Sequence, residues 1–140
     1  FDEAILCGAY AELDEELKTL AADVCVKYAQ QMDKFQFSMA LNEVFRLLDR
    51  ANKYIDENAP WVLAKSEEQR PRLAKVLYNL LETVRICAGL LTPFMPDTVA
   101  EIGKRLAPGR YKARKQEIRY ISANVYSKVL FRNSLKYPHF

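Results

Sequence analysis

The sequence predicts an all-α fold, an antiparallel helical bundle, and three observations lead to this prediction. Apolar residues recur at steps of three and four over long stretches of the 140-residue chain. No segment alternates apolar and polar residues for long enough to be a convincing strand. Glycine is scarce, with four in the chain, and the six prolines fall mostly between the periodic segments. Because each apolar stripe needs a partner to cover it, the helices are expected to pack against one another.

The first two predicted helices lie in the N-terminal half. The first carries a stripe from Leu13 to Tyr28 and is expected to begin near Asp14, because acidic residues there suit the positive end of a helix. The second should stop by about Asn58, because Pro60 disfavours helical geometry in the residue before it. Its stripe comprises Phe37, Leu41, Val44, Leu48, Ala51 and Ile55.

Two further helices and a boundary are predicted in the second half. A long helix spans 73–91 and follows Glu67 and Glu68, and a shorter one follows "FMPDT" with Pro96 near its first turn. Pro108-Gly109 is the clearest boundary in the chain. We therefore expect one helical domain, residues 1–109, and a separate C-terminal segment, residues 110–140.

The C-terminal segment is strongly basic. Its eight lysines and arginines stand against a single acidic residue, Glu117. A stripe of Ile118, Ile121, Val125 and Val129 is consistent with one amphipathic helix, which could cover part of the bundle surface. A solvated face is the simpler interpretation of its cations, and contact with nucleic acid is the alternative.

Composition excludes several classes of protein. No apolar run approaches the roughly 20 residues that a membrane-crossing helix needs, so no membrane partner is expected. The three cysteines share no metal-ligand spacing, and reduced thiols in a cytosolic protein are the simplest interpretation. The only histidine is His139, near the end, and no glycine-rich phosphate loop occurs. We expect no catalytic residue, no metal site and no cofactor in this chain. Because it begins at Phe1 without an initiator methionine, we expect it to be part of a longer protein.

The joint around Trp61, the only tryptophan, is the candidate binding site. Pro60 can open a short helical turn with Asn58 or Ala59 as its N-cap, which takes Trp61 off the apolar stripe of the preceding helix. The N-terminus of that turn would favour an anion such as phosphate. An exposed indole there would provide a platform on which an RNA base can stack.

Cations near this joint allow two interpretations. Arg46, Arg50 and Lys53 follow one another at helical spacing and could hold an RNA backbone. Asp49 and Glu57, each four residues from Lys53, could instead form ion pairs that only decorate a helix. A tryptophan after proline also commonly closes the end of a core. Spacing alone favours packing over binding and leaves the question open.

The chain closely resembles the anticodon-binding helical domain of methionyl-tRNA synthetases. The strings that carry the resemblance are "RANKYIDENAPWVLAK" and "RLAKVLYNLLETVRICAGLLTPFMPDTVAEI", with "MDKFQFSMALNEVFRLLDRANKYIDENAPW" extending it upstream. It runs from roughly Asp14 to Leu106. It implies an all-α bundle placed after a catalytic domain, with the methionine tRNA anticodon loop and that parent catalytic domain as partners. The parent would be a cytoplasmic ligase that uses ATP and methionine.

The resemblance also implies roles for single residues. The tryptophan of the family's "APW" motif stacks on an anticodon base, a role that falls on Trp61, and Pro60 positions it. Asn52 and Tyr54 match the family pattern and are interpreted as mainly structural. Lys53 and Lys65 are inferred as phosphate contacts from charge and position. The family's first helix, which supplies further anticodon-reading Asn and Arg side chains, would lie before Phe1.

A second hypothesis belongs to another class of function. The same apolar stripes would serve a helical protein-interaction or oligomerisation module that does not bind RNA. Such a module would bury Trp61, or use it against protein.

Overall fold

The computed structural model of the chain describes residues 3–106, and every regular element in that range is an α-helix. The helices are α1 (Glu3–Asp33), α2 (Phe37–Asn58), α3 (Pro60–Leu63), α4 (Arg70–Leu91) and α5 (Pro96–Leu106). The predicted all-α fold class is confirmed.

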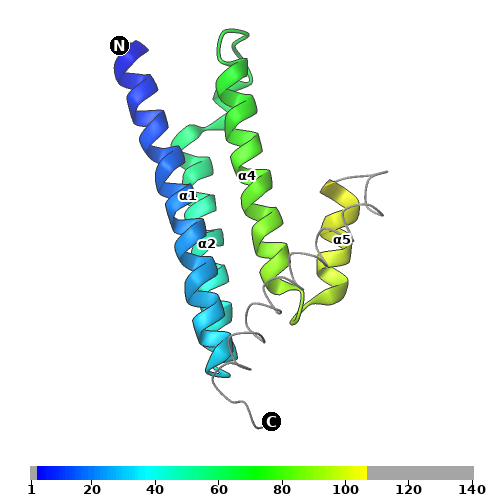
Figure 1. Ribbon diagram of the computed structural model, residues 1–140. Coiled ribbons are helices and arrows are strands. Elements are labelled where there is room, and N and C mark those ends of the chain that lie inside the picture. The colour runs from blue at the N-terminus through cyan, green and yellow to red at the C-terminus, as the bar shows by residue number, and fades with distance from the viewer. Residues whose placement is uncertain (1–2, 107–140) are drawn as a thin grey trace.

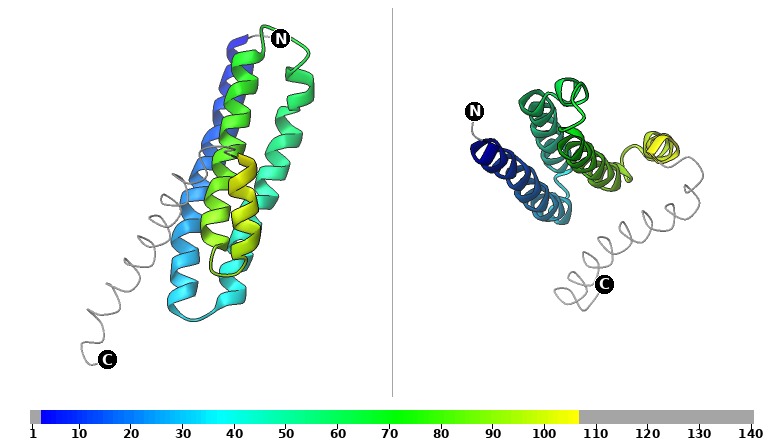
Figure 2. Two further views of the ribbon diagram at one scale, coloured as in Figure 1. Left: turned by 90° about the vertical axis from the view of Figure 1, so that its right-hand side faces the viewer. Right: turned by 90° about the horizontal axis from the view of Figure 1, so that it is seen from above.

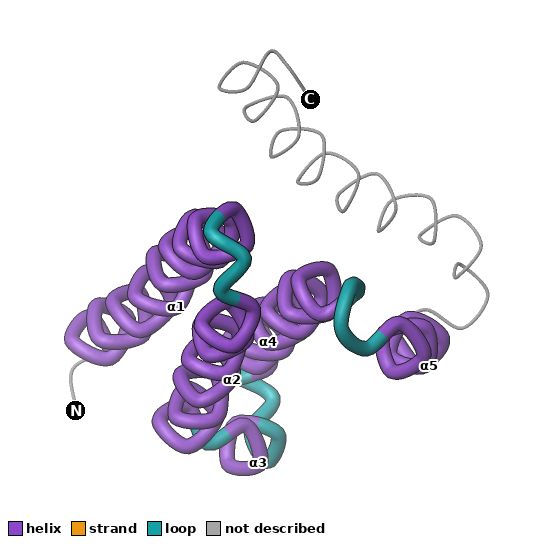
Figure 3. Tube along the Cα trace, turned by 90° about the horizontal axis from the view of Figure 1, so that it is seen from below, coloured by secondary structure: helices purple, strands orange, loops and turns teal. Residues whose placement is uncertain are grey.

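Helices α1, α2 and α4 form a bundle in which each touches the other two. The chain runs down α1, returns along α2 and runs down again in α4, so α2 is antiparallel to both neighbours (Figure 1). Helix α5 packs against α4 on the side away from α1, and α3 lies beside the end of α2 and contacts α4 (Figure 3). The bundle is elongated along its helix axes (Figure 2).

The core forms where the three long helices meet. Its fully buried apolar side chains come from all of them and include Leu17, Val24, Val44, Leu47 and Val76. One buried polar contact joins α1 to α4: the Tyr28 hydroxyl donates to the carbonyl oxygen of Leu90 at 2.7 Å. The stripe predicted for α1 lies in this core. The stripe predicted for α2 is only partly right, because Val44 and Ala51 are buried whereas Phe37 is 48% exposed.

Most helix boundaries agree with the sequence-based prediction, and one does not. Helix α2 ends at Asn58 and α5 begins at Pro96, as expected. The expectation that the first helix begins near Asp14 was wrong, because α1 already begins at Glu3. Asp14 lies inside α1 with only 1% of its surface exposed, so its charge serves a tertiary contact and not a helix end.

Residues 110–140 lie outside the described residues, so the expectation of a separate basic segment stays a prediction. Over 3–106, no helix combines the length and apolar character that a membrane crossing demands.

Candidate functional site

The joint between α2 and α3 is a sharp change of direction made at one residue. Ala59 caps α2 in the left-handed conformation, with φ 44° and ψ 64°, and its N–H donates to the carbonyl oxygen of Ile55 at 2.9 Å. Pro60 follows as the first residue of α3, where its missing N–H costs nothing and its fixed φ suits a helix. The sequence-based expectation of a new turn opened by Pro60 is confirmed, and of the two expected N-cap candidates, Asn58 and Ala59, the structure uses Ala59.

Trp61 is not among the residues of the core. Its surface is 55% exposed, and the next residue, Val62, is 54% exposed. Only Leu63 of this four-residue helix is buried. The joint therefore presents an indole to solvent on a turn that is anchored to the bundle by one apolar side chain.

The expected attraction of this joint for anions is weak. Helix α3 is four residues long, so few peptide dipoles add up at its N-terminus. Electrostatic attraction for an anion at this joint therefore has to come from side chains.

The four cations named in the sequence analysis lie in two kinds of surroundings. Arg46 is ion-paired at 2.7 Å with Asp23 of α1, and the Arg50 side chain, 9% exposed, bridges Glu16 of α1 and Glu57. These contacts, above all the hydrogen bonds that Arg50 donates to Glu16, raise the pKa of Arg50.

The two lysines are more open. Lys53 has 71% of its side chain exposed, and its Nζ lies 3.9 Å from Glu57, at the limit of an ion pair. Lys65 is exposed just after α3. Among the four, these lysines have the greater freedom to meet a new anion.

Beneath the joint lies a buried polar cluster that the sequence analysis missed. Asp14 of α1 receives hydrogen bonds from Arg72 of α4 at 2.8 and 3.0 Å, and one from the Tyr54 hydroxyl at 2.5 Å. Lys75 adds an ion pair to the same carboxylate at 3.2 Å. Tyr54 also accepts from the side-chain amide of Asn79 at 3.1 Å. The structural role expected for Tyr54 is confirmed.

The cluster reaches the joint through Asn58, the last residue of α2. A guanidinium nitrogen of Arg72 donates to the side-chain oxygen of Asn58, and the Asn58 amide donates to the carbonyl oxygen of Tyr54 at 2.8 Å. Arg72 also lies over the ring of Tyr10, 4.2 Å from its centroid. One guanidinium thus links α1, the end of α2 and the first turn of α4.

The electrostatics of Asp14 reflect this environment. Burial alone would raise the pKa of its carboxyl group, but hydrogen bonds from Arg72, Tyr54 and Lys75 outweigh burial and lower the pKa from 3.8 to about 2. Asp14 is therefore ionised at neutral pH.

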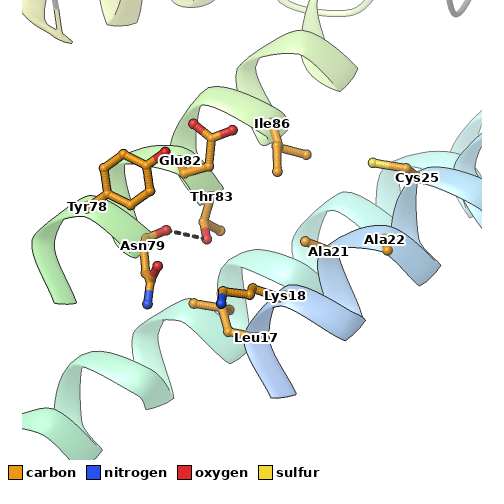
Figure 4. Close-up of a pocket in the computed structure, with 10 residues that line it drawn as sticks. All are labelled: Leu17, Lys18, Ala21, Ala22, Cys25, Tyr78, Asn79, Glu82, Thr83 and Ile86. Carbon is orange, nitrogen blue, oxygen red and sulfur yellow. Dashed lines mark hydrogen bonds between the residues drawn. The ribbon is translucent and has the colours of Figure 1, made fainter. Parts of the chain in front are cut away.

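A separate groove opens between α1 and α4 (Figure 4). Its volume is about 310 Å³ and most of its lining is apolar, from residues such as Ala21, Cys25 and Ile86. The Thr83 hydroxyl there donates to the Asn79 carbonyl oxygen at 2.8 Å, which leaves it engaged within α4. Over residues 3–106, no three His, Cys, Asp or Glu residues gather as a metal site would require.

Comparison with known proteins decides the family. The family model described as "Anticodon binding domain of methionyl tRNA ligase" matches residues 6–126, which is most of the chain. The chain belongs to this family.

Its curated relatives are methionine–tRNA ligases. That of Caldanaerobacter subterraneus subsp. tengcongensis is 50% identical over 95 residues, which are 68% of this chain and 15% of that protein. That of Enterococcus faecalis is 50% identical over 93 residues, 66% of this chain and 14% of that protein. The matched part of this chain thus spans about one seventh of the length of these ligases.

A solved structure agrees with this assignment. The apo form of the Mycobacterium tuberculosis methionyl-tRNA synthetase matches with a TM-score of 0.62 and 34% identity, over 64% of this chain and 19% of that one. Over the matched residues, the helical arrangement of this chain is therefore shared with that synthetase.

Proposed function

We propose that this domain binds the anticodon loop of methionine tRNA and that Trp61 stacks on an anticodon base. The observation that carries the proposal is the exposure of a tryptophan on the hydrogen-bonded turn between α2 and α3. An indole that served only to close the core would be buried, whereas that of Trp61 is 55% exposed. Stacking of a base on an aromatic ring contributes about 1–3 kcal/mol in single-stranded recognition.

Pro60 acts in this proposal by setting the direction of Trp61. As the first residue of α3 it fixes its own φ, and its neighbour Ala59 makes the turn. The backbone of the turn is closed by Val62 N–H, which donates to the Ala59 carbonyl oxygen at 2.8 Å. The indole thus projects from a hydrogen-bonded turn and not from a loose loop.

In this proposal Lys53 and Lys65 are the main contacts to the tRNA backbone. Arg46 and Arg50 contribute less to backbone binding. The ammonium groups of the lysines are exposed or loosely paired, so they meet a phosphate without breaking a close ion pair. Arg50 would have to leave Glu16 and Glu57 to do the same, and Arg46 would have to leave Asp23. Breaking the pairs of the largely buried Arg50 offsets much of what a phosphate contact would contribute, whereas the exposed Arg46–Asp23 pair costs less to break.

The larger protein would be a methionine–tRNA ligase. Its catalytic domain, which consumes ATP and methionine, is the expected intramolecular partner of this domain. The domain itself would hold no cofactor and would supply recognition of the tRNA.

Fluorescence of Trp61 tests the proposal, because no other tryptophan contributes to the signal of the chain. A stem-loop with the methionine anticodon should quench this fluorescence with saturation. A stem-loop of the same length with a changed anticodon should require much higher concentrations. Equal quenching by both stem-loops, or none at millimolar concentration, would contradict anticodon reading by Trp61.

A second candidate function, contact with protein, is favoured by one observation at the opposite end of the bundle. Phe35, at the turn between α1 and α2, is 78% exposed and packs edge-to-face on Phe37, which in turn meets Phe94. We propose that these rings dock against another part of the larger ligase, since exposed apolar patches mark interaction surfaces.

The docking proposal makes a distinct prediction for the full-length ligase. Phe35→Ser should lower its thermal stability by more than it lowers that of the 140-residue chain, which loses only the contact with Phe37. Phe45→Ser is the matched control, because Phe45 is about half exposed on α2 outside this cluster. The same loss for both variants would contradict docking through the rings at the turn.

A further inference from the structure

The segment that carries Trp61 is short and is anchored to the core by one buried side chain. Helix α3 is one turn long, two of its four residues are more than half exposed, and only Leu63 reaches the core. Ala59 adopts a left-handed backbone, which costs an alanine about 1–2 kcal/mol. Such a conformation persists where the surrounding structure over-determines it. The residues that hold Ala59 in this conformation lie around Asn58.

The side chain of the residue before the turn, Asn58, is held by two hydrogen bonds. The side chain of Asn58 is buried, its amide donates to the Tyr54 carbonyl oxygen, and its oxygen accepts from Arg72. Its neighbour Ala59 donates to Ile55 at 2.9 Å. The last turn of α2 is therefore pinned to α4 at the position where the chain leaves the helix.

Arg72 is itself fixed in turn. Two of its nitrogens donate to Asp14 of α1, and the guanidinium lies over the ring of Tyr10. An arginine presents several donors in a planar fork, so it can hold one carboxylate and one amide oxygen together, which a lysine does less well. A buried ion pair contributes little net stability compared with apolar packing. Unlike an apolar contact, however, the hydrogen-bonded pair fixes the relative orientation of its two partners.

We propose that Asn58 and Arg72 are positioning residues for Trp61: the Asp14–Arg72–Asn58 chain of contacts holds the joint so that the indole is pre-oriented for a stacked base. This inference rests on the proposed function for its consequence in RNA binding. Its structural part, the immobilisation of Trp61, stands without RNA. Pre-organisation of this kind increases affinity because less freedom is lost on binding.

Asn58→Ala is the direct test, with Asn79→Ala as the matched control. Both asparagines are buried and both donate to Tyr54, one to its carbonyl oxygen and one to its hydroxyl, but Asn79 lies on α4 away from the joint. Time-resolved fluorescence anisotropy of Trp61 is measured on the free 140-residue chain at a temperature at which circular dichroism shows the variants folded. Asn58→Ala should gain a fast depolarising component, and Asn79→Ala should not. The same component in both, or in neither, would overturn the proposal.

Two further variants keep the test decisive if Asn58→Ala does not fold. Arg72→Lys can still pair with Asp14 but cannot bridge to Asn58 in the same way, so the fast component should appear. Asn58→Asp keeps an oxygen acceptor for Arg72 and loses only the donor to the Tyr54 carbonyl oxygen, so its fast component should be smaller than that of Asn58→Ala. Failure of either expectation would count against Asn58 and Arg72 as positioning residues.

Binding of the methionine anticodon stem-loop separates this inference from the proposed function. If both hold, Asn58→Ala should weaken binding about fivefold, the equivalent of one lost hydrogen bond, and Asn79→Ala should have little effect. If Trp61→Ala binds the stem-loop as well as the unmodified chain does, the proposed function fails, and the anisotropy result alone still decides the positioning role. A fast component in Asn58→Ala with unchanged affinity would overturn the claim that pre-orientation matters for binding.

Discussion

Replacing Asp14 by asparagine should remove a pH-dependent part of the stability of the bundle. Folding lowers the pKa of this carboxyl group from 3.8 to about 2, so the unfolded chain binds more protons than the folded protein between these values. The ionised carboxylate therefore stabilises the fold above about pH 4, and this contribution is lost as the pH falls through about 2. Nearly two pKa units correspond to roughly 2 kcal/mol.

The cost of the substitution at neutral pH is larger than this pH-dependent part. Arg72 would keep its charge in a buried position without its carboxylate partner, and breaking a buried pair in this way costs about 3–5 kcal/mol. For a domain of this size, each kcal/mol lowers the melting temperature by roughly 4–8 °C. At pH 6, Asp14→Asn should thus melt well over 10 °C below the unmodified chain.

Urea unfolding followed by circular dichroism at pH 6 and at pH 2 measures both parts. The difference in unfolding free energy between the two proteins should shrink by roughly 2 kcal/mol from pH 6 to pH 2. Carboxyl groups elsewhere titrate in both proteins and cancel in this comparison. Asp23→Asn is the control: the hydrogen bond from Arg46 lowers the pKa of Asp23, but this ion pair is exposed, so salt should largely abolish its effect. A difference for Asp14→Asn that is the same at both pH values would refute the reasoning.

Three further outcomes are expected. Ala59→Gly should raise the unfolding free energy slightly, by up to about 1 kcal/mol in chemical denaturation, because glycine adopts the left-handed conformation without strain; a loss of stability would contradict this. Cys87 should stay unmodified by a thiol reagent at pH 8 until the protein unfolds, because burial raises the pKa of its thiol to about 12. Peptide mapping measures this labelling, and rapid labelling would contradict the burial of Cys87. Lys53→Gln and Lys65→Gln should each reduce the slope of log affinity for the stem-loop against log salt concentration by about 0.7, and unchanged slopes for both would remove these lysines from the interface. Arg50→Gln should instead lower the unfolding free energy, since Arg50 joins α1 to α2.

The sequence predicted the helices well, because their order depends on local patterns. Apolar spacing located the long helices, and Pro60 and Pro96 marked where new ones begin. The start of α1 was missed because its first ten residues lack the clear apolar stripe that begins at Leu13. An acidic cluster at that point looked like a helix N-terminus, and only the tertiary contact with Arg72 reveals what Asp14 does.

The candidate site was predicted in part for the same reason. The turn at Pro60 is a local feature and was found, whereas the polar cluster joins residues 14, 58 and 72, which no helical spacing relates. One signal was available within α2. Its buried residues follow the series Ala40, Val44, Leu47, Ala51, Tyr54 and Asn58, at steps of four and three, so Asn58 occupies a core position. A polar residue in a core register demands a partner, but the identity of that partner follows only from the fold.

The central claim is that Trp61 stacks on a base of the methionine anticodon, and side-by-side substitution tests it most directly. The affinity of a labelled methionine anticodon stem-loop is measured for the unmodified chain, for Trp61→Ala and for Val62→Ala, whose side chain is equally exposed on the same turn. Loss of a stacked base predicts that Trp61→Ala binds more weakly by about 1–3 kcal/mol, or roughly 5- to 150-fold, while Val62→Ala stays close to the unmodified chain. Equal affinities for all three proteins would contradict the account.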